Sequence, residues 1–261
     1  MKTVVITGGS SGIGKEIAQY FSLNEYKVYE LSRSGISTNK IIHLDCDITD
    51  QKAIEESINY IINDSGRIDI LINNAGFGIS GAIEYTNLED VKKQFDVNFF
   101  GAVRVIKESL PILRKNKGRI VNVSSVGGIF ALPYQAFYSA SKFALNGYTL
   151  ALSNEIKRFG VSSCVVMPGD TKTNFTQKRV KNELGQNVYG NSIEKSISLM
   201  EKDEQKGMMA SKVGKRIYKI AIKRKIKPTY VIGTKYKLFS VLQKILPIRF
   251  VNYLVGKIYA K

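Results

Sequence analysis

The chain contains one histidine, His43, and two cysteines, Cys46 and Cys164, among its 261 residues. His43 lies in the apolar run 41–44, far from any nucleophile signature, so we interpret it as a structural residue. A Ser-His-Asp hydrolase and a zinc site with several histidine ligands are thereby excluded. The cysteines show neither CxxC nor metal-ligand spacing, and we interpret them as buried, reduced thiols. We therefore expect no metal site.

Long apolar runs, repeats and flexible linkers are also missing. No segment reaches the roughly 18 uninterrupted apolar residues of a membrane-spanning helix, and no low-complexity tract divides the chain. The N-terminus passes directly into a short apolar run and lacks the pattern of a signal peptide. Because 44% of the residues are hydrophobic, a large core is possible. We expect a single domain over residues 1–261 and a cytoplasmic location.

Acidic residues are absent from the last fifth of the chain. Residues 1–204 hold 24 Lys and Arg against 22 Asp and Glu, whereas residues 205–261 hold 15 basic residues and no acidic one. Nearly the whole net charge of +17 is therefore concentrated toward the C-terminus. This charge distribution predicts a basic surface that contacts an anionic partner. No nucleic-acid-binding motif accompanies it, so nucleic acid is not an expected partner.

Short β-branched runs alternate with longer helical patterns along most of the chain. This alternation predicts an α/β fold, a single Rossmann-type, doubly wound parallel sheet with helices on both faces. We expect about seven strands in the order 3-2-1-4-5-6-7. The expected strands cover residues 3–7, 27–32, 40–44, 68–73, 119–124, 162–167 and 229–232. The longest helical patterns cover residues 87–115 and 136–159, and residues 170–227 read as helical and polar without strong strand signals.

The first strand is followed by the glycine-rich pattern TGGSSGIG at residues 7–14, and a helical pattern begins there. Glycine lets the backbone adopt positive φ and approach a pyrophosphate, to which the helix N-terminus offers unpaired N–H groups. Glycines alone are weak evidence, but the strand before them and the helix after them make them informative. The pattern predicts a dinucleotide site. Its residues are Gly8, Ser10, Ser11, Gly12, Ile13 and Gly14.

The second strand leads into Ser32 and Arg33. In dinucleotide folds an acidic residue near this point binds the ribose 2′-hydroxyl, whereas an arginine accommodates a 2′-phosphate. A guanidinium is suited to bidentate phosphate binding. The pair therefore favours NADP(H) over NAD(H), although Glu30, two residues earlier, would favour the opposite if the register shifted.

Tyr138 and Lys142 are four residues apart in a helical pattern, so they lie on one face of a helix. A cation beside a phenol favours the phenolate and lowers the pKa, which makes a tyrosine usable as an acid and base. Ser125 follows the fifth expected strand, 13 residues before Tyr138. That is the edge at which open α/β sheets bind ligands. The pattern predicts proton transfer between Tyr138 and a carbonyl or alcohol oxygen.

Six motifs together carry a resemblance to a known family. They are TGGSSGIG (7–14), NNAG (73–76), VN (97–98), NVSS (122–125), YSASK (138–142) and PG (168–169). In order and spacing they resemble the short-chain dehydrogenase/reductase family, closely over residues 3–173 and loosely beyond. The resemblance implies an oxidoreductase that moves a hydride between nicotinamide and a carbonyl or secondary alcohol. It also implies a homodimer or homotetramer.

The resemblance implies a role for each matching position. Tyr138 would donate and accept the proton, and Ser125 would orient and polarise the carbonyl. Lys142 would lower the Tyr138 pKa and bind the nicotinamide ribose. Asn98 would hold a water that links Lys142 to a proton relay. The remaining positions that match cofactor contacts are Asp47, Ile48, Asn74, Ala75, Gly76, Pro168, Gly169, Thr171 and Thr173.

Substrate choice in the family is set by the region after Gly169 and by the C-terminus. In this chain these are the substrate-loop region, residues 170–225, and a basic amphipathic tail, residues 234–261. Pro247 is expected to divide the tail into two short helices, which could lie on an anionic membrane surface, cover the cleft as a lid, or enter a subunit interface. The aromatic residues that flank the expected site favour either an apolar, elongated substrate or plain core packing. They are Phe130, Tyr134, Phe137 and Phe175.

Three hypotheses of function follow. The first is a soluble NADP(H)-dependent reductase of a hydrophobic ketone or aldehyde, similar to a steroid, lipid or retinoid, with possible peripheral contact to a membrane. The second is a reductase of 3-oxoacyl groups on an acidic carrier protein, which basic residues could dock. The third is a non-catalytic NADP-sensing membrane or scaffold protein. The presence of Ser125, Tyr138 and Lys142 weighs against the third.

Overall fold

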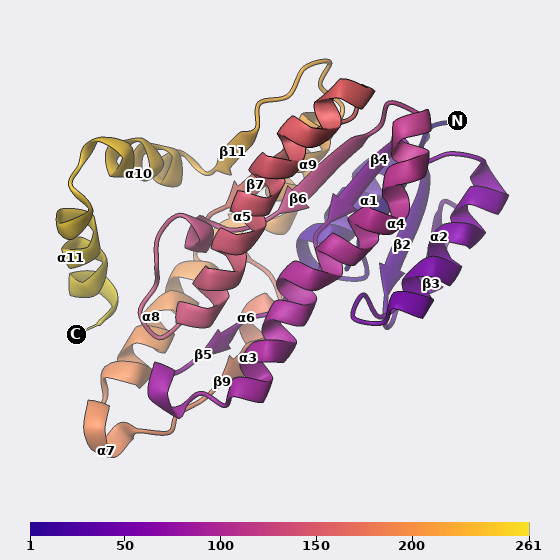
Figure 1. Ribbon diagram of the computed structural model, residues 1–261. Helices are drawn as coiled ribbons and strands as arrows, with labels where there is room; N and C mark the ends of the chain where they lie inside the picture. The colour runs from indigo at the N-terminus through magenta and orange to yellow at the C-terminus, as the bar shows by residue number, and fades with distance from the viewer. Residues whose placement is uncertain (261) are drawn as a thin grey trace.

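The computed structural model describes residues 1–260 and centres on a seven-stranded parallel sheet (Figure 1). Its spatial order is β3-β2-β1-β4-β6-β7-β11, with every neighbouring pair parallel. Counted along the chain, these strands have the predicted order 3-2-1-4-5-6-7. The bounds are β1 Thr3–Thr7, β2 Lys27–Ser32, β3 Ile41–Asp45, β4 Ile70–Asn73, β6 Arg119–Val123, β7 Ser162–Pro168 and β11 Thr229–Ile232.

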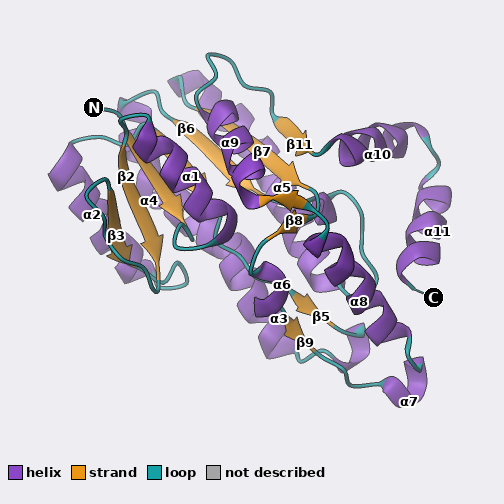
Figure 2. Ribbon diagram, turned by 180° about the vertical axis from the view of Figure 1, so that it is seen from behind, coloured by secondary structure: helices purple, strands orange, loops and turns teal. Residues whose placement is uncertain are grey.

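Helices cover both faces of the sheet and enclose two separate cores (Figure 2). The alternation of β1 shows the division, because Val5 belongs to the core under α2, α4 and α5, whereas Val4 and Ile6 belong to the core under α1 and α9. Each fully buried aliphatic side chain contributes about 1.5–3 kcal/mol to folding. The bounds are α1 Gly12–Leu23, α2 Gln51–Ser65, α4 Ala102–Lys115, α5 Ala136–Ile156 and α9 Ala210–Ala221.

The helical pattern at residues 87–115 is not one regular α-helix. It forms α3, Leu88–Phe95, then a π-helical segment, Asp96–Gly101, and then α4. The hydrophobic periodicity predicted a continuous helix because the chain keeps its helical course through the π segment. The local change in hydrogen-bond pairing leaves no clear signal in the sequence. Such segments are often found at functional sites, and this one holds Asn98.

The region between β7 and β11 contains α6 Phe175–Lys178, α7 Gln186–Tyr189 and α8 Ser192–Gln205. It also contributes short strands that the sequence pattern did not predict. β8 Thr171–Lys172 pairs with β10 Met208–Met209, and β5 Ile79–Ser80 pairs with β9 Val180–Lys181. Strands of two residues carry no readable period, so only the long-range pairing defines them. Short 3₁₀ turns cover Ile83–Tyr85, Val126–Gly128 and Lys157–Phe159.

The chain ends in two helices, α10 Thr234–Ile245 and α11 Ile248–Tyr259, on either side of Pro247. Both lie at the margin of the molecule, beyond the edge strand β11 (Figure 1, Figure 2). Within residues 1–260, no helix combines the length and the apolar character needed to cross a membrane.

Candidate active site

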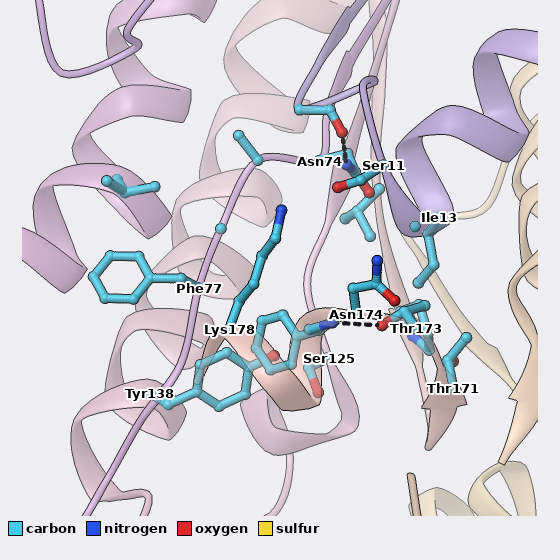
Figure 3. A pocket seen from close by; sticks show the side chains of 18 of the residues that line it. Ser11, Ile13, Asn74, Phe77, Ser125, Tyr138, Thr171, Thr173, Asn174 and Lys178 are labelled. Atoms are coloured by element: carbon cyan, nitrogen blue, oxygen red, sulfur yellow. Dashed lines mark hydrogen bonds between the residues drawn. The ribbon is translucent and has the colours of Figure 1, made fainter. Parts of the chain in front are cut away.

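A cleft of about 710 Å³ runs along the carboxyl ends of the central strands. Open α/β sheets bind ligands at this edge. Tyr138 and Ser125 lie toward one end of the cleft, and Asn74 and Ser11 toward the other (Figure 3). Of the predicted site residues, all of which fall within residues 1–260, all but Gly14 and Asn98 line the cleft.

The glycine loop has the backbone that its motif predicts. Gly8 and Gly12 have φ values of 65° and 54°, in the left-handed region that favours glycine. A Cβ atom on Gly14 would overlap the carbonyl oxygen of Gly8, so the loop and α1 meet too closely for any side chain. Within residues 1–260 no side chain caps the N-terminus of α1. Its first N–H groups are therefore available to an anionic group.

Asn74 connects the loop after β4 to the glycine loop after β1. Its side-chain Nδ2 donates to the carbonyl oxygens of Thr7 and Gly8 at 3.2 and 3.0 Å. Its backbone N–H donates to the Thr7 hydroxyl at 3.0 Å, and so does that of Ala75 at 3.2 Å. These bonds hold the loop after β4 against the glycine loop at the edge of the cleft.

The end of β2 separates Arg33 from Glu30. Arg33 is exposed and lines the cleft with Ser32, whereas Glu30 is buried beneath Gly9. The Nδ1 atom of His43 lies 2.6 Å from Oε2 of Glu30. His43 therefore has a structural contact, with the carboxylate of Glu30, the acidic side chain that would favour NAD(H) if the register shifted.

Ser125, Tyr138 and Lys142 converge at the inner end of the cleft. The Ser125 hydroxyl accepts a hydrogen bond from the backbone N–H of Gly127 at 3.0 Å, which orients it at the start of the turn after β6. Lys142 Nζ donates to the carbonyl oxygen of Val123 at 3.3 Å and lies 5.8 Å from the centre of the Tyr138 ring. α5 presents both side chains on one face because they are four residues apart.

Burial dominates the electrostatics of this group. It raises the pKa of Tyr138 to about 12, and the adjacent Ser125 hydroxyl opposes this shift. It also lowers the pKa of Lys142 to about 8. The sequence pattern predicted that Lys142 lowers the Tyr138 pKa; in this structure burial is the largest influence on that pKa and raises it. Both side chains are buried, and low polarity penalises the charged form of each.

Asn98 lies behind the cleft in the π-helical segment. Its Oδ1 accepts from the backbone N–H of Phe77 at 2.9 Å, and its Nδ2 donates to the Phe77 carbonyl at 2.9 Å and to the Ser141 hydroxyl at 3.1 Å. The side chain therefore holds the loop after β4 against α5. A Cβ atom on Gly76 would lie 3.0 Å from Asn98 Oδ1 and 3.4 Å from Lys142 Nζ, so the three residues adjoin one another.

The loop after β7 approaches the glycine loop and the tail. The Thr171 hydroxyl donates to the Gly169 carbonyl at 2.8 Å, and the Thr173 hydroxyl accepts from the backbone N–H of Phe175 at 3.1 Å. A Cβ atom on Gly12 would lie 3.6 Å from the side chain of Thr173. Gly169 packs so closely on the ring of Tyr236, in α10, that any side chain there would overlap it.

Of the four aromatic residues expected around the site, only Phe175 lines the cleft among residues 1–260. The centre of its ring lies 5.7 Å from the centre of the Tyr138 ring. The guanidinium carbon of Arg179 lies over the same Phe175 ring, 5.7 Å from its centre. Tyr134 packs instead in a small separate core under α8. The pattern of aromatic residues along the chain could not distinguish these environments, because both are apolar.

Several cleft residues were missed from the sequence. Glu204, in α8, forms a salt bridge with fully buried Arg179 and accepts from the Thr176 hydroxyl at 2.5 Å. Asp170 accepts from the hydroxyl of Tyr236; burial raises the pKa of this carboxyl, and the Tyr236 hydroxyl opposes the shift. Neither Glu204 nor Asp170 belongs to one of the six motifs, so the sequence offered no signal for them. The other missed lining residues include Phe77, Gln135, Asn174, Lys178, Met200 and Tyr259.

The match to a family model for short chain dehydrogenases covers residues 2–184. The chain therefore belongs to the short-chain dehydrogenase/reductase family and is an oxidoreductase with a Rossmann-like fold, as the six motifs predicted. It is 42% identical over 263 aligned residues to a 3-ketodihydrosphingosine reductase of Bacteroides thetaiotaomicron, with 98% of this chain and 97% of that protein covered.

Two solved structures are similar over nearly the full chain. A short-chain dehydrogenase from Streptomyces avermitilis superimposes with a TM-score of 0.83 at 25% identity, covering 94% of this chain and 93% of that one. ElxO, solved with NADP bound, superimposes with a TM-score of 0.76 at 31% identity, covering 91% of this chain and 99% of that one.

Proposed function

We propose that this protein reduces a long-chain lipid ketone with NADPH and that Tyr138 delivers the proton. The convergence of Ser125, Tyr138 and Lys142 at the inner end of the cleft carries the proposal. The outer end of the same cleft is formed by the glycine loop and by Arg33. Nucleotide and carbonyl sites are therefore continuous, as hydride transfer between them requires.

The choice of NADP(H) is supported by charge at the end of β2. The exposed guanidinium of Arg33 can bind a phosphate on the ribose with two hydrogen bonds. Glu30, the acidic side chain that would bind a free ribose hydroxyl, is buried and engaged by His43. The positive-φ glycines and the uncapped N-terminus of α1 fit the pyrophosphate. When bound, the cofactor supplies the hydride.

The protein supplies the proton and its positioning. Ser125 donates a hydrogen bond to the carbonyl oxygen, which draws charge toward that oxygen as the carbon is reduced. Tyr138, kept protonated by its raised pKa, transfers its proton to the same oxygen. The phenolate that remains is buried, and the ammonium group of Lys142 next to it offsets the negative charge. In the reverse direction the phenolate accepts the proton of an alcohol.

The substrate class is supported by the relative from Bacteroides and by the chemistry of the cleft. The ketone in that relative's name bears an amino group next to its carbonyl and a long alkyl chain. Phe175, Met200 and Leu132 offer apolar lining in this cleft, and the Phe175 ring lies 5.7 Å from that of Tyr138. Glu204 lines the same cleft, and its negative charge raises the Tyr138 pKa. We propose that this carboxylate, while it keeps its bonds to Arg179 and Thr176, also accepts a hydrogen bond from the amino group through a remaining lone pair.

The test is NADPH oxidation with 3-ketodihydrosphingosine, with the same ketone lacking its amino group, and with a 3-oxoacyl thioester. We expect fastest turnover of the amino ketone and loss of turnover in Tyr138→Phe, with NADPH binding retained. The change in NADPH emission on titration reports binding. If the wild type binds NADPH and oxidises it with none of the three, the proposed activity is wrong. If the thioester is preferred, only the substrate is wrong.

A further inference from the structure

Helix α10 turns its polar side toward the protein and its apolar side toward solvent. The partly buried positions of α10 are Tyr236, Ser240 and Gln243. Tyr236 donates to Asp170, and Gln243 Nε2 donates to the carbonyl oxygen of Ile129 at 2.9 Å. The exposed positions include Leu238, Val241 and Ile245, which are 59%, 54% and 74% exposed. Helices on globular proteins normally have the reverse arrangement.

Helix α11, which follows Pro247, is also largely exposed. Val251 is its only buried residue within the range that the structure describes. Ile248 is 70% exposed and Tyr253 is 62% exposed. We call the exposed apolar side chains of both helices the tail face. Its ten members are Leu238, Phe239, Val241, Leu242, Ile245, Ile248, Phe250, Tyr253, Leu254 and Ile258. Single exposed apolar residues are ordinary, but ten on two successive helices mark an interaction surface.

Charge decides between the possible occupants of the tail face. Its neighbours Lys235, Lys237, Lys244, Arg249 and Lys257 are all exposed. The segment from residue 205 onward contains no acidic residue at all. A second copy of this chain, placed with the same face against it, would bring the basic residues of the two tails together, and neither tail contains an acidic partner. A surface of anionic lipid offers both opposite charge and an apolar layer.

We infer that α10 and α11 dock on the surface of an anionic bilayer, with the tail face inserted at the level of the headgroups. Each helix has 12 residues, which span about 18 Å. A bilayer core of about 30 Å is too thick for either helix to cross. The helices therefore lie in the plane of the interface, where the basic side chains reach the lipid phosphates.

The docked surface adjoins the active-site cleft. Tyr259, at the end of α11, lines the cleft, and Tyr236 of α10 bonds to Asp170, another lining residue. Helix α11 therefore contributes Tyr259 to the wall of the cleft, and α10 is joined to that wall through Asp170. Docking would place the opening beside the lipid phase. The docking itself does not depend on the proposed substrate and is tested without it.

The experiment is co-sedimentation of the full chain with vesicles of phosphatidylcholine, alone or with phosphatidylglycerol added. We expect at least tenfold stronger binding to the anionic vesicles, weakened by added salt. The double variant Ile245→Glu, Ile248→Glu places charge in the centre of the tail face and should lose at least tenfold in binding. The matched control, Leu23→Glu with Leu88→Glu, changes two exposed leucines elsewhere and should bind like the wild type.

NADPH binding and the thermal midpoint confirm that both variants are folded. The inference is overturned if the wild-type protein does not bind anionic vesicles, or if it binds both vesicle types equally. So does a tail-face variant that binds like the wild type. Light scattering tests the other occupant. If the wild type is a dimer that the tail-face variant converts to a monomer, and vesicles are not bound, a second copy covers this face.

Discussion

The Nζ atom of Lys142 lies 5.8 Å from the centre of the Tyr138 ring, and both side chains are buried. Burial moves their pKa values toward the neutral forms, to about 8 for Lys142 and about 12 for Tyr138. At neutral pH the pair is therefore a protonated phenol next to an ammonium group. This state is prepared to give a proton to a carbonyl oxygen.

The first prediction concerns pH. The kcat/KM of reduction should fall as the pH rises through about 8, because Lys142 then loses the charge that offsets the phenolate. Tyr138 itself stays protonated there, since its pKa is about 12. The values of kcat/KM, obtained from initial rates between about pH 6 and about pH 10, report the pKa values of the ionising groups in the free enzyme. In the Lys142→Arg variant, the kcat/KM that remains should not fall over this range, because arginine stays charged. A flat wild-type profile across the range would contradict the assignment.

The second prediction concerns the cofactor. Arg33→Ala should weaken NADPH binding by about 1.5–3 kcal/mol, the usual value of a hydrogen bond to a charged group, and leave NADH binding nearly unchanged. The reason is that only NADPH carries the 2′-phosphate. Dissociation constants for both cofactors, measured by NADPH and NADH emission, give the comparison. An equal loss of binding free energy for both cofactors would show that Arg33 does not bind the 2′-phosphate.

The third prediction concerns the buried salt bridge beside the site. Glu204→Gln should lower the free energy of unfolding by about 3–5 kcal/mol, because the Arg179 charge stays buried without its partner. The Arg179 side chain is 0% exposed, whereas Lys181, which pairs with Glu201, is 40% exposed. The matched control Glu201→Gln should therefore cost at most about 1 kcal/mol. Urea unfolding measures both variants, and equal costs would contradict the role of burial.

The fourth prediction concerns two glycines. Gly14→Ala should weaken NADPH binding at least about tenfold, since a methyl group there overlaps the Gly8 carbonyl and displaces the loop. Gly147→Ala is the control, because among residues 1–260 no atom lies within 4 Å of a Cβ built there. It should stabilise α5 by up to about 1 kcal/mol and leave binding unchanged. Thermal midpoints and NADPH titrations distinguish loop distortion from general loss of stability.

Much of the fold and of the candidate site could be predicted because the signals are local. Short β-branched, apolar runs mark the seven strands, and the parallel crossovers restrict their order. Loops at the carboxyl ends of these strands necessarily meet, which brings Gly8, Asn74 and Ser125 to one cleft. The spacing of Tyr138 and Lys142 on a helix is also a local property. Two-residue strands such as Ile79–Ser80 have no such signal, because pairing with a distant segment alone defines them.

The tertiary structure alone decided what surrounds these groups. Residue spacing placed Lys142 beside Tyr138, but the depth of burial set the direction of both pKa values. Arg179 and Glu204 come from separate segments of the divergent region, and only packing of α8 brings them together. The amphipathic pattern of the tail predicted two helices around Pro247. It could not tell which side faces the protein, because hydrogen bonds from Tyr236 and Gln243 to distant residues determine the rotation of α10.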